Sequence, residues 1–314
     1  MQYINEMREG DNVLGHYLCK DKQQFKSKAG KPYISLKIQD KTGVADAKIW
    51  DVNSPDIKDF QTNTFIKIMG NVVIFNNNIQ INIRKLRPSE EGEYFPMDYI
   101  PTTERDVNEM YDELDKFIDS VKNAYLNKLL KEIFYNNEDV KKSFSTHSAA
   151  KNIHHNYLGG LMEHTLNVAE ICEFMSGRFK NVNRDLLITA ALLHDIGKVR
   201  ELSDFPVNDY TEEGQLLGHI YMGAEMVAET AAKIDGFPKD MELLLKHCIL
   251  AHHGSYEFGS PKLPRLIEAY ILHCVDSMDA LTKVFDEILE NNENSGLWTS
   301  YSRLFQGTLR KSEF

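Results

Sequence analysis

The stretch ALLHDIGKV, residues 191–199, places a histidine and an aspartate side by side at the end of an apolar run. The apolar run predicts a buried helix. A buried carboxylate is costly unless it is paired or bound to a metal ion, so His194 and Asp195 need partners from elsewhere in the chain. Ten of the eleven histidines lie between His147 and His273, and we expect the partners to come from this segment.

Other helical patterns in the same segment also direct ionisable side chains toward the core. A lone histidine on an apolar stripe is more often a hydrogen-bonded core residue than a ligand. Several histidines and two aspartates together are better satisfied by a divalent cation, and the lack of cysteine ligands argues against a structural zinc site. The residues placed on apolar stripes by their spacing are His164, His219, His252 and Asp276, and His253 is the neighbour of His252 at a helix end.

These residues resemble the H…HD…D signature of the HD-domain metal-dependent phosphohydrolases. The stretches GGLMEHTLNV (159–168) and HCVDSMDAL (273–281) also resemble that family's usual context. The resemblance implies two divalent ions, with Mn²⁺ expected and Co²⁺, Fe²⁺, Ni²⁺ or Zn²⁺ suited to the same ligands. It implies one ion held by His164, His194, Asp195 and Asp276, and a second, bridged by Asp195, held by His219 with His252, His253 or both.

Further positions are candidate catalytic contacts to a substrate phosphate. Lys198 lies one turn beyond the HD pair, and its alternative interpretation is an ordinary cation at a helix C-terminus. His154 and His155 precede the first ligand, and they could instead cap a helix or lie on the surface. Asp279, one turn after Asp276, competes with it as a ligand, and the family pattern favours Asp276.

Before residue 90 the pattern changes to short strands. KPYISLKIQD (31–40) alternates apolar and polar side chains, and about five such strands fit here without helical crossovers. This predicts a small antiparallel β-barrel that resembles the OB-fold. Aromatic and basic side chains on its outer face are typical of single-strand binders, although aromatic rings also plug barrel ends. The candidate nucleic-acid contacts are Phe25, Tyr33, Lys37, Lys48 and Trp50.

The chain is therefore expected to be multidomain. We predict an OB-fold nucleic-acid-binding domain over 1–88, a linker over 89–102, an all-α HD phosphohydrolase domain over 103–290 and a C-terminal appendage over 291–314. No strand pattern is evident after residue 103.

The charge differs between the two parts of the chain. Residues 1–90 hold 14 Lys and Arg against 10 Asp and Glu, whereas the rest of the chain holds 22 Lys and Arg against 37 Asp and Glu. The basic part suits a nucleic-acid polymer, and the acidic part suits divalent cations.

Targeting and membrane signals are absent from the pattern. The charged start lacks the apolar core of a secretory signal, and the apolar runs are far below the ~20 residues of a membrane span. The four cysteines are scattered, without a CxxC pair. We therefore expect a cytoplasmic protein with no membrane partner.

An OB-like module followed by an HD phosphohydrolase domain resembles the YhaM family of 3′→5′ exoribonucleases. The resemblance implies metal-dependent hydrolysis of single-stranded RNA from the 3′ end, with single-stranded DNA as a further candidate substrate. The residues alone support a metal-dependent phosphohydrolase joined to a single-strand binder. Alternatives are an HD phosphodiesterase for nucleotides or cyclic dinucleotides and a non-catalytic regulatory protein that binds single-stranded nucleic acid. A homo-oligomer is compatible with the sequence.

Overall fold

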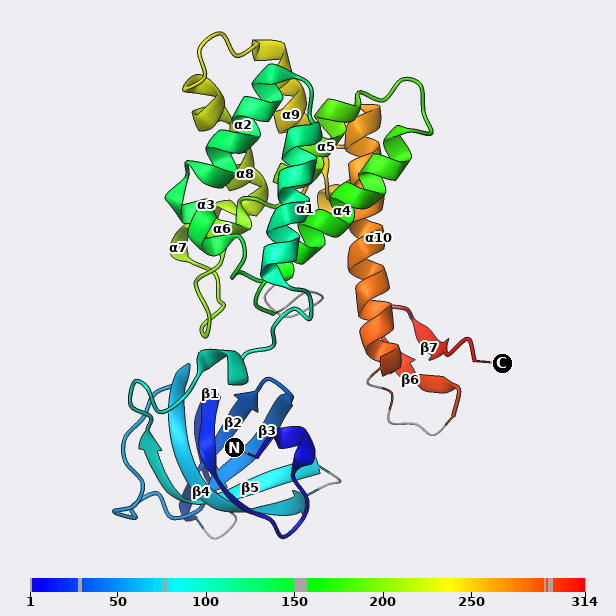
Figure 1. The fold of residues 1–314 in the computed structure, drawn as a ribbon. Helices are drawn as coiled ribbons and strands as arrows, with labels where there is room; N and C mark the ends of the chain where they lie inside the picture. The colour runs from blue at the N-terminus through cyan, green and yellow to red at the C-terminus, as the bar shows by residue number, and fades with distance from the viewer. Residues whose placement is uncertain are drawn as a thin grey trace. The chain divides into compact units, whose positions relative to one another are not determined.

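Two lengths of chain with different patterning fold into two separate units (Figure 1). The computed structural model describes residues 2–27, 30–75, 78–149, 157–290, 292 and 296–313. One unit comprises Met1–Thr102 with Phe205–Val207, and the other comprises Thr103–Asp204 with Asn208–Phe314. Among the described residues, no helix is both long and apolar enough to cross a membrane.

The first unit is a closed five-stranded barrel with the strand order β1-β2-β3-β5-β4. Its alternating side chains place Tyr17, Ile38 and Ile66 in an interior that water does not reach. All neighbouring strands are antiparallel except β3 and β5, which pair in parallel and close the barrel. The strands are β1 (Asn12–Lys26), β2 (Pro32–Asp40), β3 (Gly43–Ile49), β4 (Thr64–Phe75) and β5 (Asn78–Pro88).

Short segments flank the barrel on both sides in sequence. The 3₁₀-helix η1 (Ile4–Glu6) is fixed by a hydrogen bond from the Ile4 amide to the buried Asp40 carboxylate, at 2.7 Å. The segment 89–102, where we expect a linker, belongs to the barrel unit and contains η2 (Pro96–Asp98). Tyr94 and Tyr99 from this segment pack on the ring of Phe65.

The second unit is built mainly of helices, several of which start at side chains that cap their first amides. Asp106, Asn123, Asn137, Asn183 and Thr211 each accept a hydrogen bond from a backbone amide at such a start. The helices are α1 (Val107–Ser120), α2 (Ala124–Tyr135), α3 (Glu138–Ser143), α4 (Gly160–Ser176), α5 (Arg184–Leu193), α6 (Lys198–Glu201), α7 (Glu212–Leu217), α8 (His219–Ala232), α9 (Lys239–Ala251), η3 (Tyr256–Phe258) and α10 (Ile267–Glu290).

Helix α5 lies at the centre of this unit. All its residues from Leu186 to Leu193 are buried, and it packs against α4, α9 and α10. The apolar run therefore does form the buried helix that the sequence predicts. His194 and Asp195 follow immediately at its end, deep inside the unit, with 0% and 2% exposure.

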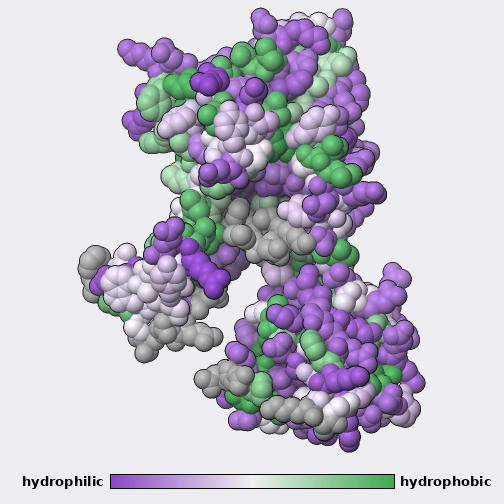
Figure 2. All heavy atoms as spheres, turned by 180° about the vertical axis from the view of Figure 1, so that it is seen from behind, coloured by the Kyte–Doolittle hydropathy of each residue, from purple (hydrophilic) through white to green (hydrophobic). Residues whose placement is uncertain are grey.

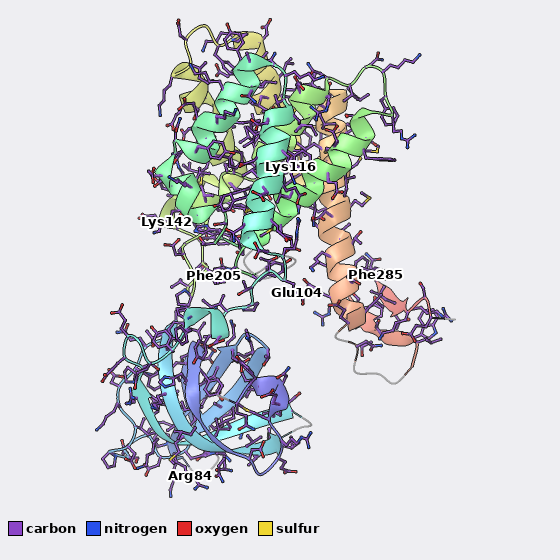
Figure 3. All side chains as sticks on the ribbon, viewed as in Figure 1. Arg84, Glu104, Lys116, Lys142, Phe205 and Phe285 are labelled. Atoms are coloured by element: carbon purple, nitrogen blue, oxygen red, sulfur yellow. The ribbon has the colours of Figure 1, made fainter. Side chains whose placement is uncertain are left out.

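The prediction that no strand follows residue 103 is wrong. β6 (Trp298–Ser302) and β7 (Gly307–Arg310) form an antiparallel hairpin, which we call the C-terminal hairpin. Most of its side chains are exposed, so no alternating apolar face marks the strands in the sequence. Phe285 of α10, which is labelled in Figure 3, contacts Phe305 in the turn of this hairpin, and their ring centroids are 5.1 Å apart.

Candidate metal centre and nucleic-acid surface

The predicted metal ligands come together from five parts of the helical unit. They form two groups, each with its possible ligand atoms within 4.8 Å of one another. The deeper group is His164 of α4, His194 after α5 and Asp276 of α10, and the second group is His219 at the start of α8 with His252 and His253 after α9.

Asp195 lies between the two groups. Its Oδ2 is 3.4 Å from Nε2 of His194 and 3.6 Å from Nε2 of His164. Its Oδ1 is 3.4 Å from Nε2 of His219 and 3.6 Å from Nε2 of His252. One carboxylate therefore faces both groups, with a different oxygen toward each.

Three buried polar atoms of this centre have no hydrogen-bond partner among the described residues. They are Oδ1 of Asp195, Nε2 of His219 and Nε2 of His252. Leaving such atoms unsatisfied costs about 1–3 kcal/mol each. Imidazole nitrogens and carboxylate oxygens are good ligands for divalent transition metals, so a cation among these atoms would satisfy all three. The residues present thus fit a metal ion.

The other ring nitrogen of each histidine is already engaged. Nδ1 of all five lies 2.6–2.9 Å from a carbonyl or carboxylate oxygen, so each ring carries a proton on Nδ1 and Nε2 is the nitrogen that would bind a metal. The acceptors are the carboxylates of Asp279 for His164 and of Glu201 for His219, and the carbonyls of Ala191 for His194, Ile249 for His252 and Phe258 for His253.

Lys198 pairs with the central carboxylate. Its Nζ is 2.6 Å from Oδ2 of Asp195, and it is the first residue of α6. Burial alone would raise the pKa of Asp195, but the Lys198 charge and the neighbouring histidines hold it well below its usual range. The carboxylate therefore stays ionised, which is the form that binds metal.

His164 shows how negative the deeper group is. Burial lowers the pKa of this imidazole, but hydrogen bonds to Asp276 and Asp279 raise it to about 9. Burial would raise the pKa of Asp276, and its hydrogen bond with His164 instead holds it below the usual range. The charge that favours a proton at this position equally favours a metal cation.

Two carboxylates have roles that the sequence did not indicate. Glu201 accepts hydrogen bonds from both Nδ1 and the backbone amide of His219, each at 2.9 Å. Asp279, considered as a rival ligand, instead contacts Nδ1 of His164 at 2.6 Å. Nothing in the sequence spacing of Glu201 distinguishes it from a surface acid, although the structure shows that it is buried. The predicted contacts His154 and His155 lie outside the described residues.

A close backbone approach positions the second group. A Cβ on Gly197, two residues after Asp195, would lie 2.1 Å from the carbonyl oxygen of His219. On the other helix, a Cβ on Gly223 of α8 would lie next to the backbone nitrogen of Gly197. Glycine at 197 therefore lets the first turn of α8 reach the HD turn and brings His219 to Asp195.

The barrel carries the predicted aromatic contacts as a row across three strands, which we call the aromatic row. Ring centroids of Phe25 in β1 and Tyr33 in β2 are 5.7 Å apart, and those of Tyr33 and Trp50, just after β3, are 4.9 Å apart. Phe25 is 44% exposed and Trp50 is 52% exposed. These rings therefore do not fill the interior, which Tyr17 occupies instead.

Lysines accompany the row. Lys48 lies over the Tyr33 ring, 5.8 Å from its centroid, and also contacts the Ser35 hydroxyl. Lys37 is exposed and opposite Asp46 in the β2–β3 register. Figure 2 shows hydrophilic residues over most of the visible face of the barrel, with few hydrophobic ones among them. Exposed rings with adjacent cations are the combination that single-stranded nucleic acids bind.

Comparison with known proteins matches both units to families. Residues 161–281 match the HD domain, and residues 20–89 match an OB-fold nucleic-acid-binding domain. The chain is thus an HD-domain protein, of a metal-dependent class, that also carries a nucleic-acid-binding OB-fold.

Whole-chain relatives narrow this class. The chain is 34% identical to the 3′-5′ exoribonuclease YhaM of Bacillus velezensis over 287 residues, which is 90% of this chain and 88% of that protein. The proteins of the same name from Bacillus subtilis and Listeria innocua are also 34% identical, over 90% of this chain and 88% and 90% of their own lengths. The chain belongs to the YhaM family.

Proposed function

We propose that this chain is a metal-dependent 3′→5′ exoribonuclease that hydrolyses single-stranded RNA. The observation that carries the proposal is the position of Asp195, a buried carboxylate that faces two groups of histidine Nε2 atoms with separate oxygens. Membership of the YhaM family and the OB-fold barrel support RNA as the substrate. We assign nucleic-acid binding to residues 1–88 and hydrolysis to residues 103–290.

Each group would hold one divalent ion, with Mn²⁺ as the expected ion. The deeper group and Asp195 would hold the first ion, and His219, His252, His253 and Asp195 would hold the second. Such ions supply positive charge that stabilises the transition state of phosphoryl transfer. Histidine and carboxylate ligands suit Mn²⁺ as well as its neighbours in the transition series.

The residues of the chain then have separate tasks. Glu201 and the backbone carbonyls keep the histidine protons on Nδ1, so the Nε2 atoms stay available. Lys198 holds Oδ2 of Asp195 and lines the same cavity as Asp276, where its cation could also meet a phosphate oxygen. The aromatic row would stack bases of the strand while Lys37 and Lys48 meet its phosphates.

Two finer expectations follow from the same features. Ring stacking and phosphate contacts do not require a 2′-hydroxyl, so single-stranded DNA should be a second substrate.

Cys19, Cys172 and Cys248 are buried free thiols, and a reducing cytoplasm would keep these thiols reduced.

The decisive experiment follows 5′-labelled single-stranded RNA in the presence of Mn²⁺. We expect a ladder that shortens from the 3′ end, and no ladder after chelation. Asp195→Asn should lower the rate by about 10³-fold, because it weakens both groups. Asp240→Asn, which changes an exposed aspartate of α9, is the matched control and should be unchanged. Intact RNA with every divalent ion tried would refute the proposal.

A further inference from the structure

A cavity of about 500 Å³ lies against the second metal group in the helical unit. Its lining is divided between two chemistries. The charged part contains Asp195, Lys198, Glu201, His219, His253 and Asp276. The part that we call the apolar wall contains Leu202, Tyr210, Phe258, Ala280, Leu281 and Leu304.

We propose that the apolar wall binds the nucleobase of the 3′-terminal nucleotide. This inference rests on the proposed function and adds a subsite to it. The 3′-terminal nucleoside is attached to the scissile phosphate through its O5′, so a phosphate held at the charged part leaves that nucleoside within reach of the rest of the same cavity. The volume lies within the range of ~300–1,000 Å³ that is usual for small-ligand sites.

Two aromatic side chains give the wall its affinity for a base. Phe258 is 69% exposed and Tyr210 is 45% exposed, and both line the cavity. Aromatic rings that line one cavity together with a few polar groups are the usual composition of a small-ligand site. Every nucleobase has a flat face that stacks on such rings, so the wall should accept all four bases.

The wall is joined to the metal groups through the backbone. The Phe258 carbonyl accepts the hydrogen bond from Nδ1 of His253, so one short turn supplies both a stacking ring and the orientation of a ligand. Likewise α10 carries Asp276 and, about one turn further, Ala280 and Leu281 of the wall. A base on the wall would therefore lie at a defined place relative to the ligands.

The C-terminal hairpin completes the wall. Leu304, between β6 and β7, lines the cavity, and the neighbouring Phe305 contacts Phe285 of α10. This contact holds the hairpin turn beside the helix that carries Asp276. The segment that the sequence marks only as an appendage therefore contributes to the substrate site.

The test compares two 5′-labelled RNA substrates, one ending in an ordinary nucleotide and one ending in an abasic ribose. For the unmodified protein we expect a KM about tenfold higher for the abasic end, which corresponds to a loss of about 1.4 kcal/mol from one unstacked base. Phe258→Ala should bring the ratio of the two KM values close to one, and Phe258→Tyr, which keeps a ring, should retain the difference. Leu304→Ala should reduce the ratio by about twofold to threefold.

Matched controls are Phe179→Ala and Leu243→Ala, which remove exposed apolar side chains outside the cavity lining. Both should keep the tenfold ratio. Equal KM values for the two ends in the unmodified protein would overturn the inference while leaving 3′→5′ hydrolysis intact. A ratio that survives in Phe258→Ala and Leu304→Ala would overturn it too, because the base would then bind elsewhere. Absence of any hydrolysis would instead refute the proposed function.

Discussion

In the helical unit, each of the five site histidines has Nδ1 within hydrogen-bond reach of an oxygen, and the three best-buried rings are at most 1% exposed. In the barrel, Trp50 is half exposed and is held by contact with Tyr33 and a hydrogen bond to Asn82. The first arrangement leaves its side chains few alternative rotamers, whereas the second lets rings adjust to a ligand.

This difference should govern how each region responds to substitution. A ligand that is oriented by fixed partners loses its function when any partner moves, since misplacement by about 1 Å can cost 10²-fold in rate. Stacking rings contribute separately along a strand, so losing one of them should cost only its own share. We expect large effects from small changes around the metal groups and graded effects on the barrel.

The largest effect outside the ligands should come from Gly197→Ala. The new Cβ would lie 2.1 Å from the His219 carbonyl oxygen, so the start of α8 must move away from the HD turn. We expect hydrolysis to fall by about 10²-fold or more. The control is Gly177→Ala, where the nearest atom is 3.7 Å from the new Cβ. Initial rates and melting temperatures of both variants would separate loss of the site from loss of the fold. A normal rate for Gly197→Ala would show that this close approach does not position His219.

Glu201→Ala should have the next largest effect. Removing the carboxylate that orients His219 should weaken divalent-ion binding by about 10–100-fold, measured by calorimetric titration with Mn²⁺. Glu201→Gln keeps an oxygen that can accept the Nδ1 hydrogen bond and should lose less. The exposed acid Glu213 of α7 supplies the control, Glu213→Ala. Equal affinities for Glu201→Ala and Glu213→Ala would mean that Glu201 does not position a ligand.

On the barrel, Trp50→Ala should weaken single-stranded RNA binding by about tenfold, the lower part of the range for loss of one stacked base. Fluorescence anisotropy with a labelled oligomer measures this effect, and the maximal rate on saturating RNA should change little. Phe95→Ala removes an even more exposed ring outside the row and serves as control. Unchanged affinity for Trp50→Ala would exclude the row as a stacking surface.

The smallest effect should come from Lys37→Ala. If Lys37 meets a phosphate, the slope of log affinity against log salt should become shallower by about one. Asp46 lies opposite it in the register, and Asp46→Ala should strengthen binding because a repelling charge is lost. Salt titrations of the two variants that shift in the same direction would count against an electrostatic role for this part of the barrel.

Side-chain periodicity made much of this predictable. The apolar run before His194 indicates the buried helix α5, and the alternation around Tyr33 indicates a barrel strand, because both signals repeat along one element. The acceptors for the histidine protons were not predictable in the same way. The positions of the Ala191, Ile249 and Phe258 carbonyls depend on the backbone path through turns, which no residue type indicates.

Glu201 and the C-terminal hairpin were missed for related reasons. Glu201 acts through its distance to His219, eighteen residues away, and that distance depends on how α6 and α8 pack at Gly197. The hairpin strands are short and largely exposed, so they leave no apolar pattern. Contacts between elements, and the two short exposed strands of the hairpin, were therefore beyond the reach of sequence.

The contact between Phe285 and Phe305 has a practical consequence for handling the protein. A purification tag or fluorescent fusion placed after the C-terminal hairpin would lie close in sequence to the turn that carries Leu304, which lines the cavity. Kinetic constants measured on such a fusion can therefore include an effect of the tag on this side of the cavity. A cleavable tag ahead of the barrel avoids this source of error. Comparing the rates of the two fusions would show how much the hairpin affects hydrolysis at the 3′ end of the RNA.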